Sequence, residues 1–373
     1  MTSPRRSCFP IAVFAKRSRL SILLSCMFLL VLGIATTPLH SQTYTDLHDF
    51  NCGTDGCGGA WPGTLAQGRD GNLYGTLPTA GSSGFGTVYK ITPSGSLTAI
   101  YNFSGLSDGS TPLSGLTLGT DGNLYGATYN GGANGYGTIF KITTAGSLTT
   151  LHNFSAAEAG GDYGAPVQGK TGTLYGVTNY GKAYSITSSG TFKLLPNAIP
   201  GSGHAPLILG SDGNLYGTTQ TGGSGYGTVF RMSSTGAINV IYNFDSTHGY
   251  FPSSPVVQGS DGFLYGTTAN GGSSAHAVGL VFKLSTGGAI TVLHEFDSTS
   301  TIDGYQPVAG LVAGTDGNFY GATSAGVSGG SAPYGTLFRI TKTGTYTMLH
   351  AFDSTHGGTV ETCLLYTSDA ADE

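Results

Sequence analysis

Few side chains in this sequence have the types and the spacing that acid–base catalysis needs. The segment FDSTHGYF places Asp245, His248 and Tyr250 close together, as a lyase needs for removing one proton and supplying another. Glu158 and the nearby Asp162 could form the carboxylate pair of a glycoside hydrolase. Neither set lies in a motif of known hydrolases, metalloproteases or nucleotide-binding loops. We therefore expect a chain that is not an enzyme, with a carbohydrate-active enzyme as the alternative.

Residue types that could bind a metal ion recur only at wide intervals. The aspartate of a repeated DGN turn lacks the D-x-[DN]-x-[DN] spacing of a calcium loop, so a turn role is predicted for it. At another repeated position histidine alternates with tyrosine, which could not replace imidazole at zinc. These residues are His48, Tyr101, His152, Tyr242, His294 and His350. A half-buried side chain is predicted there, and we expect no metal ion and no cofactor.

The elements that would position such groups are tandem repeats. The hexapeptide Asp-Gly-Asn-Leu-Tyr-Gly, or a close variant, begins at Asp70, Asp121, Thr171, Asp212, Asp261 and Asp316. Around each copy, four short alternating runs are separated by two glycine turns and one longer loop, which predicts a four-stranded antiparallel sheet. One such sheet cannot bury both faces, so neighbouring sheets must pack in a ring. The predicted fold class is all-β, a β-propeller of four-stranded blades.

A seventh blade is predicted from the segment that precedes the first repeat. Tyr44 to Phe50 matches the fourth run of the later repeats, as in TTLHNF and NVIYNF. This segment would supply the outer strand of a blade whose other three strands come from the C-terminal side of the six complete units, which closes the ring and removes an open sheet edge.

The strings DGNLYGTT, GGSGYGTVF and the trailing LxxLxxF resemble the GloVer tandem repeat of exported bacterial "choice-of-anchor" proteins. The resemblance covers about residues 44 to 356. It implies export, a propeller-like repeat fold and a C-terminal surface anchor that differs among members, and it implies no activity. The third unit departs from the pattern: Thr171 replaces aspartate, and the stretch from Thr178 to Ile186 is six residues shorter than its counterpart from Thr128 to Ile142.

Binding is the function predicted for the variable loops. In a four-stranded meander, the loops between the second and third strands emerge on the same rim as the connections between blades, and the long segments all belong to these two kinds. Aromatic rings flanked by carboxylates there suit a glycan or a protein ligand. The candidates are Tyr163, Tyr250, Phe251, Tyr305, Asp162, Asp245, Asp297 and Asp303. Two alternatives are open: these rings pack under their own loops, or the chain is a purely structural surface array.

Two other sets of aromatic residues recur in every repeat, which indicates packing between blades. One set is the tyrosine of each LYG: Tyr74, Tyr125, Tyr175, Tyr216, Tyr265 and Tyr320. The other lies in the third run: Tyr89, Phe140, Tyr184, Phe230, Phe282 and Phe338.

Both ends of the chain differ from the repeats. Residues 1–41 combine a basic start, an apolar run from Leu20 to Ala35 and a cleavage site after Ser41, which predicts a signal peptide and a secreted or cell-surface protein. Residues 363–373 resemble a translated sequencing adapter, so a non-native tail is predicted and the truncated propeller is assigned to residues 42–362. In an exported chain, Cys52 and Cys57 predict a disulfide.

The composition excludes several classes of protein. The 63 glycines and the 9% of charged residues exclude long helices. A net charge of −5 lacks the basic footprint that nucleic-acid binding requires. We expect a monomer that binds a glycan or a surface protein, and that meets a membrane only through an anchor beyond the repeats.

Overall fold

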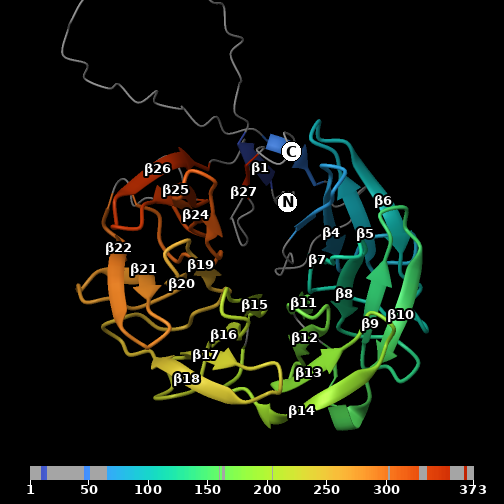
Figure 1. The fold of residues 1–373 in the computed structure, drawn as a ribbon. Helices are drawn as coiled ribbons and strands as arrows, with labels where there is room; N and C mark the ends of the chain where they lie inside the picture. Colours follow the sequence, from blue (N-terminus) through green and yellow to red (C-terminus); the bar gives the residue numbers. More distant parts are fainter. Residues whose placement is uncertain are drawn as a thin grey trace, which may run out of the picture.

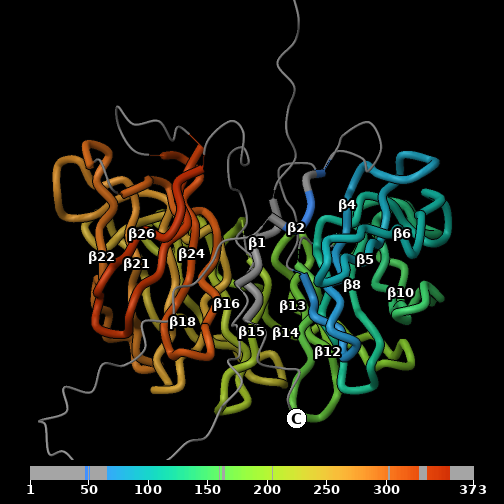
Figure 2. Tube along the Cα trace, turned by 90° about the horizontal axis from the view of Figure 1, so that it is seen from above, coloured from blue at the N-terminus to red at the C-terminus, as the bar shows by residue number. Residues whose placement is uncertain are grey.

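Six four-stranded antiparallel sheets stand around a common axis in the computed structural model, as the blades of a β-propeller (Figure 1). In each blade the order of the strands follows the chain, from the innermost strand near the axis to the outermost one. Figure 2 shows the blades from the side, with their strands running between the two rims of the ring. The structure describes residues 10–14, 46–50, 65–158, 160–161, 164–203, 205–300, 303–326, 334–352 and 365–367. The predicted all-β propeller is confirmed.

The strands of the blades are short, and each blade has a two-residue inner strand. Blade 1 comprises β3 (Ala66–Gln67), β4 (Leu73–Leu77), β5 (Thr87–Ile91) and β6 (Leu97–Asn102). Blade 2 comprises β7 (Thr117–Leu118), β8 (Leu124–Thr128), β9 (Thr138–Ile142) and β10 (Leu148–Asn153), followed by the 3₁₀ turn η1 (Ala156–Glu158). Blade 3 comprises β11 (Val167–Gln168), β12 (Leu174–Val177), β13 (Lys182–Ile186) and β14 (Phe192–Ala198).

Blade 4 comprises β15 (Ile208–Leu209), β16 (Leu215–Thr219), β17 (Thr228–Met232) and β18 (Ile238–Asn243). Blade 5 comprises β19 (Val257–Gln258), β20 (Leu264–Thr268), β21 (Ala277–Leu284) and β22 (Ile290–Asp297). Blade 6 comprises β23 (Val312–Ala313), β24 (Phe319–Ala322), β25 (Thr336–Ile340) and β26 (Tyr346–Ala351).

The glycine of the LYG motif lies under an aromatic ring of the neighbouring strand. Gly217 on β16 pairs with Phe230 on β17, and a Cβ atom on Gly217 would lie 2.5 Å from Cζ of that ring. The same contact recurs at Gly126, Gly266 and Gly321. A glycine in a strand gives up side-chain packing, but here it leaves the space that the ring occupies. This explains why LYG and an aromatic third strand recur together.

Replacing Gly217 with alanine is expected to lower the free energy of unfolding by about 2 kcal/mol, because the added methyl group overpacks a buried site. Urea unfolding measures the loss. Gly287→Ala is the matched control, since a Cβ atom there is 3.7 Å from its nearest neighbour. Equal stability of the two variants would contradict the packing role of Gly217.

The Asp-Gly-Asn turn is joined to its own blade by hydrogen bonds of the aspartate. In blade 4 the Asp212 carboxylate accepts hydrogen bonds from the Asn214 amide at 2.7 Å and from the Tyr216 hydroxyl at 2.9 Å. The Asp–Tyr bond recurs at Asp70, Asp121, Asp261 and Asp316. The turn role predicted for these aspartates is therefore confirmed.

The hydrophobic core consists of clusters between neighbouring blades. Tyr216 of blade 4, for example, packs with Leu264 and Phe282 of blade 5. The predicted inter-blade role is confirmed for the LYG tyrosines of blades 1 to 5, whereas in the described residues Tyr320 clusters within blade 6; all six are buried. A third aromatic position joins the blades as well: Phe244, which follows β18, lies edge-on to Phe282 with ring centroids 5.3 Å apart. Phe103, Phe154 and Phe296 make the same contact with Phe140, Tyr184 and Phe338.

The segment before the first repeat packs on blade 1 as an outer strand does. Phe50 lies edge-on to Tyr89 of blade 1 at 5.5 Å, which reproduces the joint between the other blades. The preceding strand β2 (Asp46–Asp49) pairs with β1 (Pro10–Phe14), and β1 pairs with β27 (Leu365–Thr367). These three strands lie between blade 6 and blade 1 (Figure 1). The outer-strand position of this segment is as predicted, while the signal peptide and the non-native tail stay predictions.

Candidate functional site

The two kinds of long loop meet on one rim of the ring, which we call the loop rim. Single β-bridges join the connection between two blades to the loop between the second and third strands of the following blade. They pair Ser110 with Asn130, Tyr250 with Asn270, and Tyr305 with Ala325. The opposite rim, the turn rim, carries the Asp-Gly and Ser-Gly turns. The separation of long loops from short turns is therefore as predicted.

Exposed aromatic residues recur on the loop rim immediately before the third strand. Phe85, Tyr136, Tyr180 and Tyr226 have exposed fractions of 44%, 45%, 76% and 38%. Each of these residues directly precedes a glycine. The carbonyl of that glycine accepts a hydrogen bond from the backbone N–H of the residue that follows the outer strand of the same blade. Tyr180 thus occupies the position of Tyr136 despite the shortened third unit. These residues are not among the predicted binding residues, although the GYG strings before the third strand are a signal for them.

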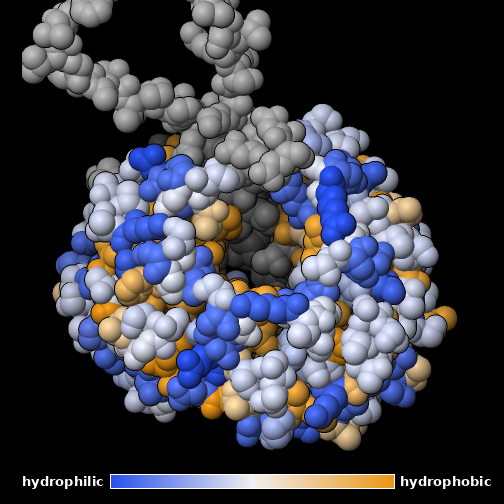
Figure 3. All heavy atoms as spheres, viewed as in Figure 1, coloured by the Kyte–Doolittle hydropathy of each residue, from blue (hydrophilic) through white to orange (hydrophobic). Residues whose placement is uncertain are grey.

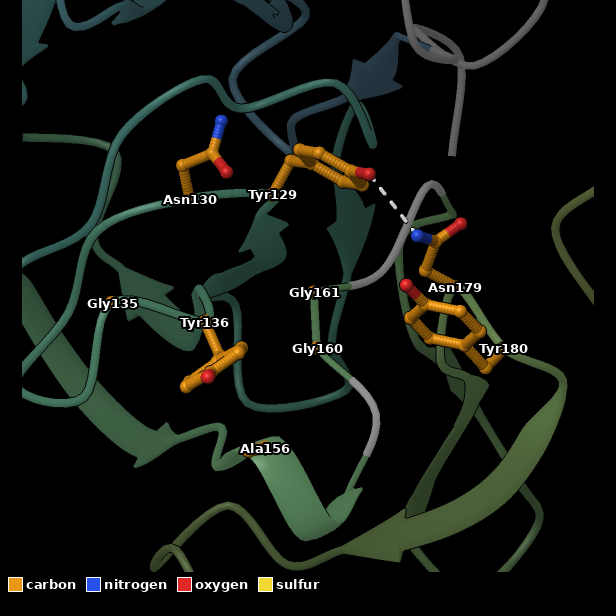
Figure 4. Close-up of a pocket in the computed structure, with 9 residues that line it drawn as sticks. All are labelled: Tyr129, Asn130, Gly135, Tyr136, Ala156, Gly160, Gly161, Asn179 and Tyr180. Atoms are coloured by element: carbon orange, nitrogen blue, oxygen red, sulfur yellow. Dashed lines mark hydrogen bonds between the residues drawn. The ribbon is translucent and has the colours of Figure 1, made fainter.

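A cavity of about 460 Å³ lies on the loop rim between blades 2 and 3 (Figure 4). Its lining includes Tyr129, Asn130, Tyr136, Ala156, Asn179 and Tyr180, together with three glycines. The Asn179 amide of blade 3 donates a hydrogen bond of 3.1 Å to the Tyr129 hydroxyl of blade 2, so a polar bridge crosses the cavity (Figure 4). Within the described part of the chain, none of these lining residues carries a charge.

The cavity adjoins the shortened loop of the third unit. Blade 2 places residues 129–137 between β8 and β9, whereas blade 3 has only residues 178–181 between β12 and β13. The short turn keeps its aromatic residue, and Tyr180 is the most exposed of the rim aromatics. Gly161, also in the lining, directly precedes the predicted binding residues Asp162 and Tyr163. These two lie outside the described residues, as do Cys52 and Cys57.

The predicted residues Tyr250 and Phe251 form a second aromatic cluster on the loop rim, between blades 4 and 5. The Tyr250 ring lies 5.7 Å from Tyr226 and 5.1 Å from Phe251. Phe251 has an exposed fraction of 39% and a φ of 57°. Thr111 and Gln306, which also directly precede a proline in a blade connection, have similar positive φ values. The connection therefore presents Phe251 outward, while Tyr250 is half-buried.

Asp245 and His248 form an exposed pair beside this cluster. The Asp245 carboxylate lies 2.9 Å from Nδ1 of His248 and accepts backbone hydrogen bonds from Thr247 and His248. Slight burial raises the pKa of Asp245, but these hydrogen bonds outweigh it and hold the pKa below its ordinary value. The side chains have exposed fractions of 51% for Asp245 and 41% for His248, so solvent screens the charge of the Asp245 carboxylate.

Asp303 does not lie on the exposed surface that the sequence analysis assigns to it. It is buried, and its carboxylate is 3.5 Å from Nε2 of His294, whose ring stacks on Tyr346 of blade 6. The connection folds back over the outer strand, which sequence spacing does not reveal. Tyr305 is half-buried beside it, and the Asp297 carboxylate accepts hydrogen bonds from Thr299. Asp303 thus contacts the outer strand of its own blade.

Glu158, a candidate for a hydrolase pair, is held by its neighbours. Its carboxylate lies 3.1 Å from Nε2 of His152 and accepts hydrogen bonds from the backbone and hydroxyl of Ser155. Burial raises the pKa of Glu158, but these hydrogen bonds outweigh it and hold the pKa below its ordinary value. The general acid of a glycoside hydrolase needs a raised pKa. The shift therefore has the wrong direction for that role.

The outer-strand histidines and tyrosines are half-buried, as predicted. His152 stacks on Phe192 of blade 3, and the Tyr101 hydroxyl donates to the Asp108 carboxylate at 3.0 Å. In the part of the chain that the structure describes, no three His, Cys, Asp or Glu side chains gather as metal ligands. None of the described segments is a helix long and apolar enough to cross a membrane.

Comparison with known proteins agrees with the propeller fold. Solved structures of a streptogramin B lyase and of virginiamycin B lyase from Staphylococcus aureus are similar to this chain, with TM-scores of 0.54 and 0.53. Both are 19% identical and cover 79% of this chain, with 84% and 85% of their own chains matched. At this identity the likeness shows a shared fold alone.

No curated protein matches the sequence. Residues 34–192 and 179–371 each match the Gloeobacter/Verrucomicrobia repeat. The two matches together span the whole ring and include the shortened third unit. The chain therefore belongs to the Gloeobacter/Verrucomicrobia repeat family.

Proposed function

We propose that this protein is a non-catalytic binding module that takes up a glycan in the tyrosine-lined cavity between blades 2 and 3. The cavity itself is the observation that carries the proposal: about 460 Å³, open on the loop rim, and lined by three tyrosines and two asparagines. Ligand sites in proteins are typically concave, about 300–1,000 Å³ in volume, with aromatic walls and a few polar groups.

The chemistry of the lining supports a sugar. Tyrosine presents a flat apolar face for the C–H face of a pyranose ring and a hydroxyl for a hydrogen bond. The amides of Asn130 and Asn179 each use one donor within the protein, toward the hydroxyls of Thr111 and Tyr129, and each keeps a second donor and an acceptor, which suits vicinal hydroxyl groups. The absence of charge among the described lining residues favours a neutral glycan over a polyanion.

Two observations support binding without catalysis. Hydrolysis of a glycosidic bond by the usual route needs a pair of carboxyl groups, one of them with a raised pKa. The described cavity lining supplies no carboxyl group, and Glu158 nearby has a lowered pKa. Two alternative functions predict other results. A carbohydrate-active enzyme would cleave a glycan bond, and a structural surface array would bind no ligand.

We also propose that the protein acts outside the cytoplasm, through the predicted signal peptide in residues 1–41. The support is the basic and apolar pattern of that segment together with the family membership. N-terminal sequencing of protein recovered from the medium or the cell surface is expected to begin at Gln42. Recovery of intact protein from the cytoplasm alone would contradict this proposal.

Tyr180→Ala is expected to weaken binding to the best glycan of an array by about 30-fold, because an aromatic ring at the centre of a site contributes roughly 2 kcal/mol. Titration calorimetry with that glycan measures the loss. Stability is expected to stay the same, since Tyr180 is 76% exposed.

The matched control is Leu106→Ala, which removes an exposed apolar side chain from the same rim between blades 1 and 2; Leu106 is 72% exposed. Equal loss in both variants, or none in either, would count against the cavity as the binding site. Shortening of the glycan during incubation with the wild-type protein would show an enzyme instead.

A further inference from the structure

A second cavity, of about 120 Å³, lies between blades 3 and 4 on the turn rim. Its polar lining consists of Lys170, Thr171, Tyr175 and Ser234, over a floor of Leu209 and Leu215. It occupies the place where the third unit departs from the repeat. In the five other units an aspartate carboxylate accepts a hydrogen bond from the LYG tyrosine at this place.

The third unit keeps the tyrosine and lacks the carboxylate. Thr171 stands at the aspartate position, and its hydroxyl is 3.4 Å from that of Thr173. Tyr175 is 5% exposed, whereas the other five LYG tyrosines are at most 1% exposed. Among the described residues, no side chain forms the hydrogen bond with the Tyr175 hydroxyl that aspartate provides elsewhere.

The positive charge of the site has also moved. Tyr175 pairs with Ser185 on the third strand of its blade. In blades 2, 4 and 5 the corresponding tyrosines pair with a basic residue: Tyr125 with Lys141, Tyr216 with Arg231 and Tyr265 with Lys283. Lys170 instead supplies an ammonium group from the turn, and it donates to the carbonyl of Ser211 in blade 4 at 2.6 Å. An ammonium group has three donors, so two remain for other acceptors.

We propose that this cavity binds a small carboxylate, such as formate or acetate, in place of the missing aspartate side chain. The lining offers hydroxyl and ammonium donors for two carboxylate oxygens, and the leucine floor accepts a methyl group. The volume admits a free acid of a few atoms and excludes larger ligands. Asp212 lies in the next turn along the ring, and its negative charge is compatible with an anion in this cavity. Blades 1 and 2 show the same arrangement, because Asp70 and Asp121 occupy neighbouring turns there.

The test measures the melting temperature of the full chain at pH 7 in sodium acetate and in sodium chloride of equal ionic strength. Acetate at about ten times its dissociation constant is expected to raise the melting temperature by about 2–3 °C above chloride, and the rise should saturate. An equal rise in the two salts would overturn the proposal. Benzoate, which is too large for the cavity, is expected to behave as chloride does.

A double variant supplies the internal control. Thr171→Asp with Thr173→Asn rebuilds the side-chain set of the other units, so it should melt higher than the wild type in chloride and lose the response to acetate. An undiminished acetate response in this variant would place the ligand elsewhere. Direct binding of ¹³C-acetate, followed by NMR line broadening in wild type and in Tyr175→Phe, decides the question independently of folding; equal broadening in both would also overturn the proposal.

Discussion

Replacing Phe244 with alanine should lower the free energy of unfolding by about 4 kcal/mol, because it empties a fully buried joint between blades 4 and 5. The ring lies 5.3 Å from Phe282 of blade 5 and shares a core cluster with Tyr216 of its own blade and Leu264 of blade 5. The surrounding strands are fixed by their own hydrogen-bond ladders. The cavity left by the ring therefore cannot collapse. Chemical denaturation followed by circular dichroism measures the loss.

Phe251→Ala is the matched control for this prediction. It removes the same side chain a few residues later in the chain, at a site with an exposed fraction of 39%. Its expected cost is below about 0.5 kcal/mol, as for surface substitutions in general. If both variants lost the same stability, the aromatic joint would not be the element that holds blade 4 to blade 5.

Acid is expected to destabilise the ring cooperatively below about pH 4.5. Partial burial raises the pKa of Asp121, but hydrogen bonds from the Asn123 amide and the Tyr125 hydroxyl outweigh it and hold that pKa below its ordinary value. The same holds for Asp70, Asp212 and Asp316, and at Asp261 the hydrogen bond from Lys283 takes the place of the one from asparagine. A carboxyl group with a lowered pKa in the folded state stabilises the protein above its unfolded-state pKa. That stabilisation is lost as the pH falls through the folded-state pKa.

Five such groups titrate over the same pH range, each with a slope of at most about 1.4 kcal/mol per pH unit, which solvent screening reduces at these exposed turns. Urea unfolding between pH 7 and pH 3 is expected to show a steep fall that begins near pH 4.5. Asp121→Asn removes one titrating group, so it should be less stable than the wild type at pH 7, and the difference should shrink as the pH falls through the folded-state pKa of Asp121. A variant that stays below the wild type by a constant amount at every pH would show that ionisation of Asp121 is irrelevant.

The architecture could be predicted from the sequence because its causes are local. Gly71 has a φ of 76° at the centre of an Asp-Gly turn, and this dipeptide predicts a hairpin at that point of the chain. Asp70, Asn72 and Tyr74 then form their hydrogen bonds within five residues. A motif that satisfies its own polar groups at short range is visible wherever it recurs.

The candidate site could be predicted only in outline, because its geometry depends on contacts between blades. The loop rim follows from strand order, but the cavity lies between Tyr136 and Tyr180, where a shortened loop of one blade stands beside a full loop of the other. The position of Tyr180 on the rim could not be predicted, because its unit lacks the Gly-Gly loop by which the other units are aligned. Asp303 is buried against His294 because the connection after blade 5 folds back over its outer strand. Residue spacing in the sequence does not predict such a contact.

The third blade also has a mechanical consequence. Ile199 stands where the other joints have phenylalanine, and the turn of this blade lacks the aspartate that anchors its tyrosine. The joint between blades 3 and 4 therefore has fewer aromatic contacts than its two neighbouring joints, and it should open before them in local fluctuations. The small turn-rim cavity lies at this same joint, so a carboxylate bound there would contact blades 3 and 4 at once and suppress that opening. Occupancy and rigidity of the ring would thus rise together.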